Sequence, residues 1–335
     1  MKVFVTGATG ELGRPTVREL VRRGHAVRGV TRTRDKAALL RSLGAQPVEM
    51  DLHDATAVKA AVVGSDAVLH LATKIPPVAR MRSRRAWAEN DRLRTEVTRV
   101  LVDAALDAGV GTFVLESITF TYPDRGAEWI DEDAPPDGET MWLRSMLDAE
   151  ASVGHFTDAG RNGIVLRLAS FYGPTARSTD EQLRLARRRV APVLGRPDAY
   201  LSSIHTDDAG TAVAATVALP AGVYNVTDDE PLTRRQYADA LAAAFGLGRP
   251  RILPGWMVRA VAGPAAAIMT RSQRVANRRF KTATGWEPRF ASARDGWAAV
   301  ASTRSGEGSG PQGSGPQGSD PKVSGKEWAK GGDGA

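Results

Sequence analysis

The sequence predicts an α/β protein built on a doubly wound parallel sheet with helices on both faces. First, short apolar runs alternate with segments of helical spacing along the first 170 or so residues. Second, a glycine-rich turn separates the first apolar run from the first helical segment. Third, the pattern loosens into shorter pieces after about residue 175, which is typical of a smaller region added to such a sheet.

The expected elements begin with the apolar run KVFVTGA at residues 2–8. The segment GRPTVRELVRRG follows, and its apolar residues share one helix face. Pro15 near its start and Gly24 just past its end are the usual asymmetry of a helix. The next elements are a strand at 26–31, a helix at 35–44, and strands at 47–52, 67–73, 112–118 and 163–170.

Composition and length bound the class of protein. The chain has 335 residues, 42% hydrophobic and 25% charged, so it has enough apolar material for a core and is not mostly disordered. No run reaches the roughly 18 to 20 apolar residues of a membrane helix, and MKVFVTGATG lacks the apolar stretch of a signal peptide. We therefore expect a cytoplasmic protein with no membrane partner.

Residues that bind metals or react as thiolates are scarce. Cysteine is absent, which excludes disulfides, thiolate nucleophiles and zinc–thiolate sites. The five histidines are scattered, with no pair at the spacing of metal ligands, so no metal site is expected.

The net charge is +7, and 37 of the 45 basic residues are arginine. Such a balance suits nucleic acid or anionic small molecules. The chain has no recognisable nucleic-acid module and no aromatic interleaving, so no nucleic-acid partner is expected. A bias toward arginine that reflects genome composition alone remains an alternative.

The turn TGATGELGRP carries the strongest local motif, with Gly7, Gly10 and Gly13 spaced G-x-x-G-x-x-G. Gly7 permits a tight turn, Gly10 lets the backbone approach a pyrophosphate, and Gly13 lets the helix pack closely on the strand. The helix N-terminus then presents N–H groups and a partial positive charge to the phosphates. Strand, turn and helix together predict a Rossmann dinucleotide site.

The end of the second strand predicts which dinucleotide is bound. NAD-binding versions place an acid there for the ribose diol, whereas this chain has Thr31 followed by Arg32 and Arg34. A missing carboxylate beside arginine favours a 2′-phosphate, so NADP is expected rather than NAD. Asp51, at the end of the third strand, could reach the adenine amino group, and a helix cap is its alternative role.

Further segments resemble the motifs of extended short-chain dehydrogenases/reductases, in the NAD-dependent epimerase/dehydratase superfamily, over about residues 2–300. TGATGELG resembles the TGxxGxxG loop, MDLHD the adenine-side Asp-Leu segment and VLHLAT the fourth-strand motif. FVLESITF resembles the strand with the catalytic serine, and LRLASFYGP resembles R-x-x-x-x-Y-G-P. SIHTDDAGTAV, VYNVTDDEPLTRRQ and RVANRRFKTATGWEP resemble the segments that follow.

The resemblance implies a set of site residues. Ser117 takes the position of the catalytic serine. The cofactor-binding residues are Gly7, Thr9, Gly10, Glu11, Leu12, Gly13, Arg32, Asp51, Leu52, Leu71 and Ala72.

The catalytic pair of the family is missing. The expected segment Y-x-x-S-K-x-x-x-E corresponds to WLRSMLDAE, in which Trp142 takes the place of the tyrosine and Met146 that of the lysine. A different register does not restore the pair, because none of the five tyrosines has a lysine four residues later. No lysine occurs between Lys74 and Lys281. The standard proton-transfer chemistry is therefore not expected.

Other acids near the expected pocket are candidates to replace the pair. Tyr122, Tyr172, Glu116 and Asp148 lie in suitable segments, with structural roles as their alternatives. Tyr172 is the preferred candidate, because FYGP would close over the nicotinamide side. Asn90 resembles the asparagine that the family places on a helix near the site.

Two arginine-rich segments border the substrate site of the related fold. Residues 80–94 read RMRSRRAWAENDRLR, and residues 184–190 read RLARRRV. Arginine there would bind an anionic substrate, and solvated basic helix faces are the alternative. Trp87, Trp129 and Trp256 are candidates to line a pocket for an aromatic ligand, with core packing as the alternative.

The expected organisation has three parts. Residues 1–174 form the dinucleotide-binding domain, to which residues 205–226 return, and residues 175–304 are mainly substrate-binding. Residues 305–335 repeat GSGPQ and are expected to be a disordered tail, with Trp328 as its one large apolar residue.

The predicted function is an NADP-binding oxidoreductase or epimerase/dehydratase that acts on a small metabolite through a non-standard active site. Two alternatives stay open: a catalytically silent NADP-binding regulator or scaffold, and a cofactor-independent isomerase or cyclase. The helices at 90–108 and 141–153 would form the homodimer interface that the family uses.

Overall fold

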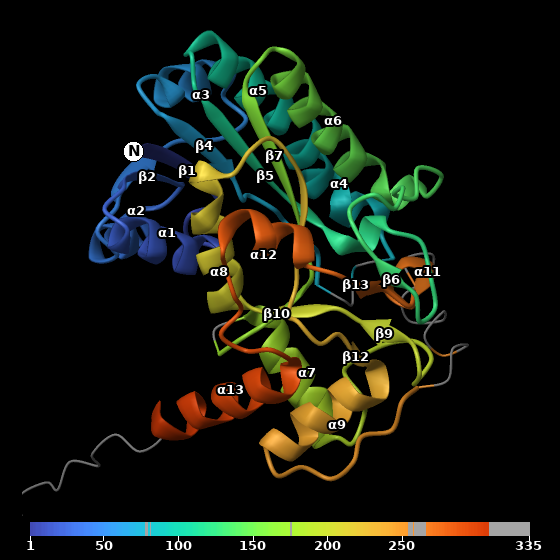
Figure 1. The fold of residues 1–335 in the computed structure, drawn as a ribbon. Helices are drawn as coiled ribbons and strands as arrows, with labels where there is room; N and C mark the ends of the chain where they lie inside the picture. The colour runs from blue at the N-terminus through green and yellow to red at the C-terminus, as the bar shows by residue number, and fades with distance from the viewer. Residues whose placement is uncertain (78–79, 81, 175, 254–256, 258–265, 308–335) are drawn as a thin grey trace, which may run out of the picture.

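The computed structural model describes residues 1–77, 80, 82–174, 176–253, 257 and 266–307. Seven strands in this part form one parallel sheet in the order β11-β7-β5-β4-β1-β2-β3 (Figure 1). The strands are β1 (Lys2–Thr6), β2 (Ala26–Thr31), β3 (Gln46–Glu49), β4 (Ala67–His70), β5 (Thr112–Ile118), β7 (Asn162–Leu168) and β11 (Gly222–Val226). The strand order reverses beside β1, as in a doubly wound sheet, and the predicted fold class is confirmed.

Helices cover both faces of the sheet and make a separate hydrophobic core on each (Figure 1). Strand β1 shows why its residues are nearly all apolar: Val3 and Val5 belong to one core and Phe4 to the other. The helices on the first face are α1 (Gly13–Arg22), α2 (Arg34–Ser42), α8 (Thr206–Ala215) and α12 (Arg278–Thr284). Those on the second are α3 (Ala55–Val62), α5 (Thr98–Asp107) and α6 (Arg144–Asp158).

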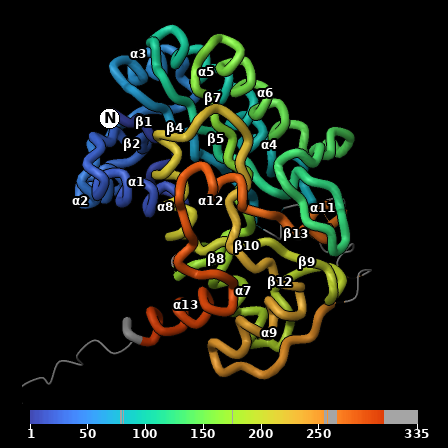
Figure 2. The backbone as a smooth tube through the Cα atoms, viewed as in Figure 1, coloured from blue at the N-terminus to red at the C-terminus, as the bar shows by residue number. Residues whose placement is uncertain are grey.

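A second, smaller lobe lies beyond the sheet (Figure 2). Its core combines aliphatic side chains with the aromatic rings of Tyr172, Tyr237 and Trp297. Its strand pairs are β8 (Ser170–Tyr172) with β10 (Ser203–His205) and β9 (Tyr200–Leu201) with β12 (Leu232–Thr233). Its helices are α7 (Arg177–Arg187), α9 (Arg234–Ala244) and α13 (Ala293–Glu307).

The remaining elements connect the two lobes or precede the sheet helices. They are β6 (Trp129–Ile130) paired with β13 (Arg274–Val275), α4 (Arg84–Arg92) and α11 (Ala266–Met269). A π-helical turn spans Leu93–Val97, and 3₁₀ turns span Thr119–Thr121, Met141–Leu143 and Thr216–Ala218.

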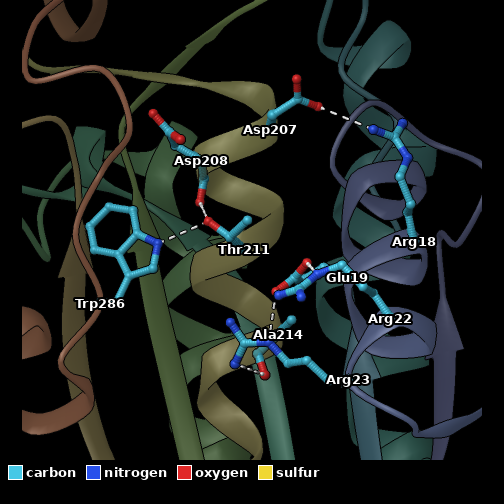
Figure 3. A network of polar contacts seen from close by, with 9 residues as sticks. All are labelled: Arg18, Glu19, Arg22, Arg23, Asp207, Asp208, Thr211, Ala214 and Trp286. Carbon is cyan, nitrogen blue, oxygen red and sulfur yellow. Dashed lines mark hydrogen bonds and ion pairs between the residues drawn. The ribbon is translucent and has the colours of Figure 1, made fainter.

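Helix α8 holds α1 in place from almost 200 residues further along the chain (Figure 3). The two helices approach so closely that a Cβ on Gly210 would lie 2.5 Å from Cβ of Pro15. Arg23 reaches the carbonyl of Ala214 at 3.5 Å, and Glu19 binds Arg23 at 2.7 Å. Because α1 begins at the glycine-rich turn, this packing also positions that turn.

The segment expected to return to the first domain lies against the sheet: α8 packs on α1, and β11 pairs with β7. The tail boundary expected at residue 305 is wrong by three residues, because α13 continues to Glu307. Arg304 holds this end of the helix through Asp180, at 2.7 Å, and the carbonyl of Pro174, at 2.8 Å. Residues 308–335, with Trp328, lie outside the described part.

Candidate active site

The glycine-rich turn brings three backbone segments close together. Gly7 has a φ of +68°, a left-handed conformation that favours glycine. A Cβ on Gly7 would overlap the carbonyl of Leu71 and lie 2.7 Å from the nitrogen of Ala72, both directly after β4. A Cβ on Gly13 would overlap the carbonyl oxygen of Gly7. The turn therefore has no room for side chains at these two positions.

The start of α1 is suited to an anionic group. Leu12 precedes the helix and provides no side-chain cap, and the first turn carries no acidic residue. A pyrophosphate could therefore accept hydrogen bonds from this end of the helix. Gly10 is exposed and donates its N–H to the carbonyl of Gly7 at 2.9 Å. Thr9 is half-buried in the same turn.

Two of the predicted cofactor-binding residues have other partners. Leu12 is buried in the hydrophobic core, so only its backbone faces the turn. The Glu11 carboxylate accepts the N–H of Arg177 at 2.7 Å and thereby connects the glycine-rich turn to the start of α7 in the smaller lobe.

A buried histidine, His70, contacts the strand that leads into the glycine-rich turn. The sequence did not predict this role. The Thr6 hydroxyl lies 2.6 Å from His70 Nδ1, and His70 Nε2 lies 3.3 Å from the carbonyl of Leu93. Burial lowers the pKa of His70 to about 4, so the ring is neutral at pH 7. The network connects the ends of β1 and β4 to the helix layer; a lone histidine inside an apolar strand was its signal.

The end of β2 carries cations and no carboxylate. Thr31 is buried, and its hydroxyl donates to the carbonyl of Thr33 at 3.3 Å. Arg32 and Arg34 are exposed, and neither pairs with an acidic side chain among the described residues. At the next strand end, the Asp51 carboxylate accepts the N–H of His53 at 3.1 Å, while Leu52 packs against the second core.

Asp51 does not act as the helix cap that was its alternative role. The cap of α3 is Asp54, which accepts hydrogen bonds from the N–H groups of Thr56 and Ala57. The Asp51 carboxylate is exposed beside the edge of the sheet.

Ser117 lies in the interior rather than at an open pocket. It is fully buried, and its hydroxyl donates to the Glu150 carboxylate at 2.6 Å. The same carboxylate binds the Arg167 guanidinium through two hydrogen bonds, at 2.6 and 3.0 Å. The Ser117 hydroxyl is therefore held in a buried hydrogen bond between β5 and α6. This contact weighs against the catalytic role expected for it.

Trp142 lies in the 3₁₀ turn before α6, and Met146 lies in the first turn of α6. Met146 is buried, whereas Trp142 is half-buried and lies edge-on to Trp87 of α4, with ring centroids 5.9 Å apart. Ser145 donates to Asp91 at 2.8 Å, which attaches the same two elements to each other. Neither Trp142 nor Met146 has a group that exchanges a proton near pH 7.

Tyr172 belongs to the core of the smaller lobe. Its ring is fully buried and packs on Trp297, with centroids 5.1 Å apart, and on His205. Burial raises its pKa well above the ordinary value. This placement weighs against the preferred candidate, because the buried phenol is a weaker acid than usual and has no access to a ligand.

The other candidate groups are also held in internal contacts. Tyr122 is buried and donates to Asn225 at 2.9 Å. Glu116 pairs with Arg94 inside the protein, at 2.7 Å, and burial raises the pKa of that carboxyl. Asp148 is exposed beside Arg144. Asn90 is buried and accepts the N–H of Lys74 at 3.1 Å.

The remaining candidates from the sequence lie apart from one another. Trp129 is exposed on β6, with the Arg274 guanidinium 4.1 Å from its ring centroid. The segment 184–190 lies at the end of α7, where Arg184, Arg187 and Arg188 are exposed. Trp256 lies outside the described residues.

The described residues offer neither a metal site nor a membrane span. No group of three or more histidine, aspartate or glutamate side chains is placed to hold a metal ion. No helix in this part of the chain has the length and apolar composition needed to cross a bilayer.

The chain is similar to several known proteins. The family model described as NAD dependent epimerase/dehydratase matches residues 3–226. A 3-diazoavenalumate denitrifying reductase from a Streptomyces species is 35% identical over 309 residues, or 88% of this chain and 99% of the relative. A 2-alkyl-3-oxoalkanoate reductase from Stenotrophomonas maltophilia is 29% identical over 272 residues, or 74% of this chain and 77% of the relative.

Among solved structures, the human epimerase family protein SDR39U1 with NADPH superposes with a TM-score of 0.73. The two chains share 22% sequence identity, and the match covers 90% of this chain and 99% of the human one. At this identity the likeness concerns the fold.

Proposed function

Because this chain belongs to the NAD dependent epimerase/dehydratase family, we propose that it is an NAD(P)H-dependent reductase whose acceptor needs no proton from the protein. The observation that carries the proposal is the pair Trp142 and Met146, which replaces the acid–base pair in a chain whose glycine-rich turn still suits a dinucleotide. A site that binds the dinucleotide but has lost its proton donor favours hydride transfer to an acceptor that needs no proton.

The residues that would hold the cofactor lie along one edge of the sheet. Gly7, Thr9, Gly10 and Gly13, with the backbone of Glu11 and Leu12, would bind the pyrophosphate at the start of α1. Arg32 would bind a ribose phosphate, Asp51 and Leu52 would lie at the adenine, and Leu71 and Ala72 would lie along the turn. A reduced nicotinamide supplies a hydride when it is bound.

The tyrosines of this chain support an acceptor that needs no proton. Four of the five are buried, and burial raises the pKa of each of these four above its ordinary value. Reduction of a carbonyl places a proton on oxygen, so it benefits from a positioned acid. The groups named above are engaged elsewhere, which favours a substrate that already carries positive charge.

An aryl diazonium has the required chemistry. A hydride that replaces the N₂ group gives the arene and neutral N₂, so charge and atoms balance with no proton transferred. The Streptomyces relative, at 35% identity, is named for denitrifying reduction of a diazo compound. We therefore assign the acceptor of this chain to aryl diazo compounds, with reduced NAD(P) as the co-reactant.

Isotope labelling tests this function. Purified protein is mixed with NADPH deuterated at both C4 positions and the aryl diazonium salt of a cinnamate that carries no ring hydroxyl. We expect one N₂ and one oxidised cofactor per arene, with deuterium at the carbon that lost nitrogen, and none there when only the solvent is deuterated. A product without cofactor deuterium would overturn the proposal. NADPH binding with no turnover of any diazonium would instead favour the regulator or scaffold.

The preference for NADP makes a separate prediction. Arg32→Ser is expected to weaken NADPH binding at least about tenfold and to leave NADH binding unchanged, because a charge-assisted hydrogen bond to phosphate contributes about 1.5–3 kcal/mol. Arg41→Ser, an exposed arginine in the last turn of α2, is the matched control. Calorimetric titration with both cofactors measures the effect. Equal losses of affinity for NADPH and NADH would show that Arg32 does not bind the ribose phosphate.

A further inference from the structure

An aromatic surface stands where the family has its catalytic tyrosine. Trp142, in the turn Met141–Leu143, meets Trp87 of α4 at an interplanar angle of 71°. Neither indole belongs to a hydrophobic core of the described residues, and both are half-buried. The hydrogen bond from Ser145 to Asp91 fixes the start of α6 against α4. This hydrogen bond joins the two elements that carry the rings, and both indoles are partly exposed.

A cation lies against the same surface. The Arg84 guanidinium carbon is 5.5 Å from the centroid of the Trp142 ring. Arg84 and Arg85 are exposed, and no acidic side chain among the described residues pairs with either. The acids that α4 does carry are engaged elsewhere: Glu89 with His53 at 3.2 Å, and Asp91 with Ser145. The positive charge beside the indoles is therefore not neutralised by this helix.

Arg84 and Arg85 do not stabilise α4 through the helix dipole. Both lie in the first turn of α4, where the helix dipole disfavours cations. Other exposed arginines nearby do have acidic partners four residues away: Arg92 has Glu96, and Arg144 has Asp148. Arg84 and Arg85 are therefore available to pair with an external anion.

We propose that Trp142, Trp87 and Arg84 bind a planar aromatic carboxylate, whose ring contacts the indoles and whose carboxylate contacts the guanidinium. This inference rests on the reductase function proposed above and names the class of its substrate. Trp142 is then a residue of substrate recognition placed where related enzymes have an acid. Aromatic contacts and a charge-assisted hydrogen bond supply the affinity.

Calorimetry of the full chain with cinnamate, in the presence of NADP⁺, tests the site without turnover. We expect cinnamate to bind, and both cinnamamide and cyclohexylpropanoate to bind about tenfold more weakly or worse. Trp142→Ala should weaken cinnamate binding about tenfold, and Trp142→Phe should retain most of it. Arg84→Gln should weaken cinnamate about tenfold and leave cinnamamide unchanged.

Arg144→Gln is the matched control, because Arg144 is an exposed arginine two residues from Trp142 with a partner of its own. An equal loss in Arg144→Gln and Arg84→Gln would reduce the effect to general electrostatics and overturn the proposal. Unchanged cinnamate affinity in Trp142→Ala would also overturn it. NADP⁺ affinity and thermal unfolding of each variant exclude misfolding as the cause of a loss.

The outcomes separate this inference from the reductase function. Cinnamate binding that depends on Trp142 and Arg84, without transfer of deuterium to a diazonium, would support the site and refute the reaction. Deuterium transfer with the same KM in wild type, Trp142→Ala and Arg84→Gln would support the reaction and refute the site.

Discussion

Replacing Gly13 with alanine is expected to weaken NADPH binding at least about tenfold and to lower the free energy of unfolding by about 1–3 kcal/mol. The added methyl would overlap the carbonyl oxygen of Gly7 and lie 2.7 Å from the carbonyl carbon of Ala8. Both are backbone atoms, so the overlap is relieved only if α1 moves away from the turn. That movement withdraws the helix N-terminus from the pyrophosphate.

Gly154→Ala is the matched control for this prediction. Gly154 lies inside α6, and no heavy atom beyond its own helix stands within 4 Å of the place where a Cβ would be. Alanine there should leave cofactor binding unchanged and add up to about 1 kcal/mol of stability. Calorimetric titration and denaturant unfolding of both variants provide the measurement. Wild-type NADPH affinity in Gly13→Ala would remove the glycine-rich turn from the cofactor site.

Replacing Glu150 with glutamine is expected to lower the free energy of unfolding by about 3 kcal/mol. The side chains of Glu150 and Arg167 are 11% and 5% exposed, and the pair is bidentate. Burial alone would lower the pKa of Arg167, but the Glu150 carboxylate outweighs this effect and raises that pKa above its ordinary value. Glutamine keeps the volume of the side chain and leaves a buried cation without its counter-charge.

A double-mutant cycle separates this pair from its surroundings. Glu150→Met with Arg167→Met should destabilise less than the sum of the two single changes, with a coupling above about 1 kcal/mol, because no unpaired charge is then buried. Arg99→Gln, in an exposed pair with Asp103, should change stability by less than about 1 kcal/mol. Urea unfolding measures all five variants, Glu150→Gln included. A loss below about 1 kcal/mol in Glu150→Gln would contradict the role given to the pair.

The sheet and its glycine-rich turn could be predicted because their signals are local. In β1 the apolar residues alternate between two cores, and a strand buried on both faces must be apolar throughout. Gly7 needs a left-handed conformation, and glycine is the residue that adopts it without strain. The tail was expected from residue 305, whereas α13 continues to Glu307, and near this end Arg304 contacts Asp180 of α7.

The candidate catalytic residues could not be placed in this way. A motif locates Ser117 on a strand, but the face that its hydroxyl occupies depends on Glu150, from a helix that begins 27 residues later. Tyr172 ends β8 in a suggestive motif, yet Trp297 and Tyr237 enclose it from distant segments. His70, which supports the turn through Thr6, acquires its role only when β1 and β4 lie side by side.

The sequence by itself determined the fold class, the position of the glycine-rich turn and the absence of a Tyr-x-x-x-Lys pair, because periodicity, glycine spacing and residue identity are properties of neighbours along the chain. Only the tertiary structure decided that Ser117 and Tyr172 lie in the interior. It also brought Trp142, Trp87 and Arg84 together on one surface. Burial and contact between distant segments depend on how helices pack against the sheet, and packing is a property of the whole fold.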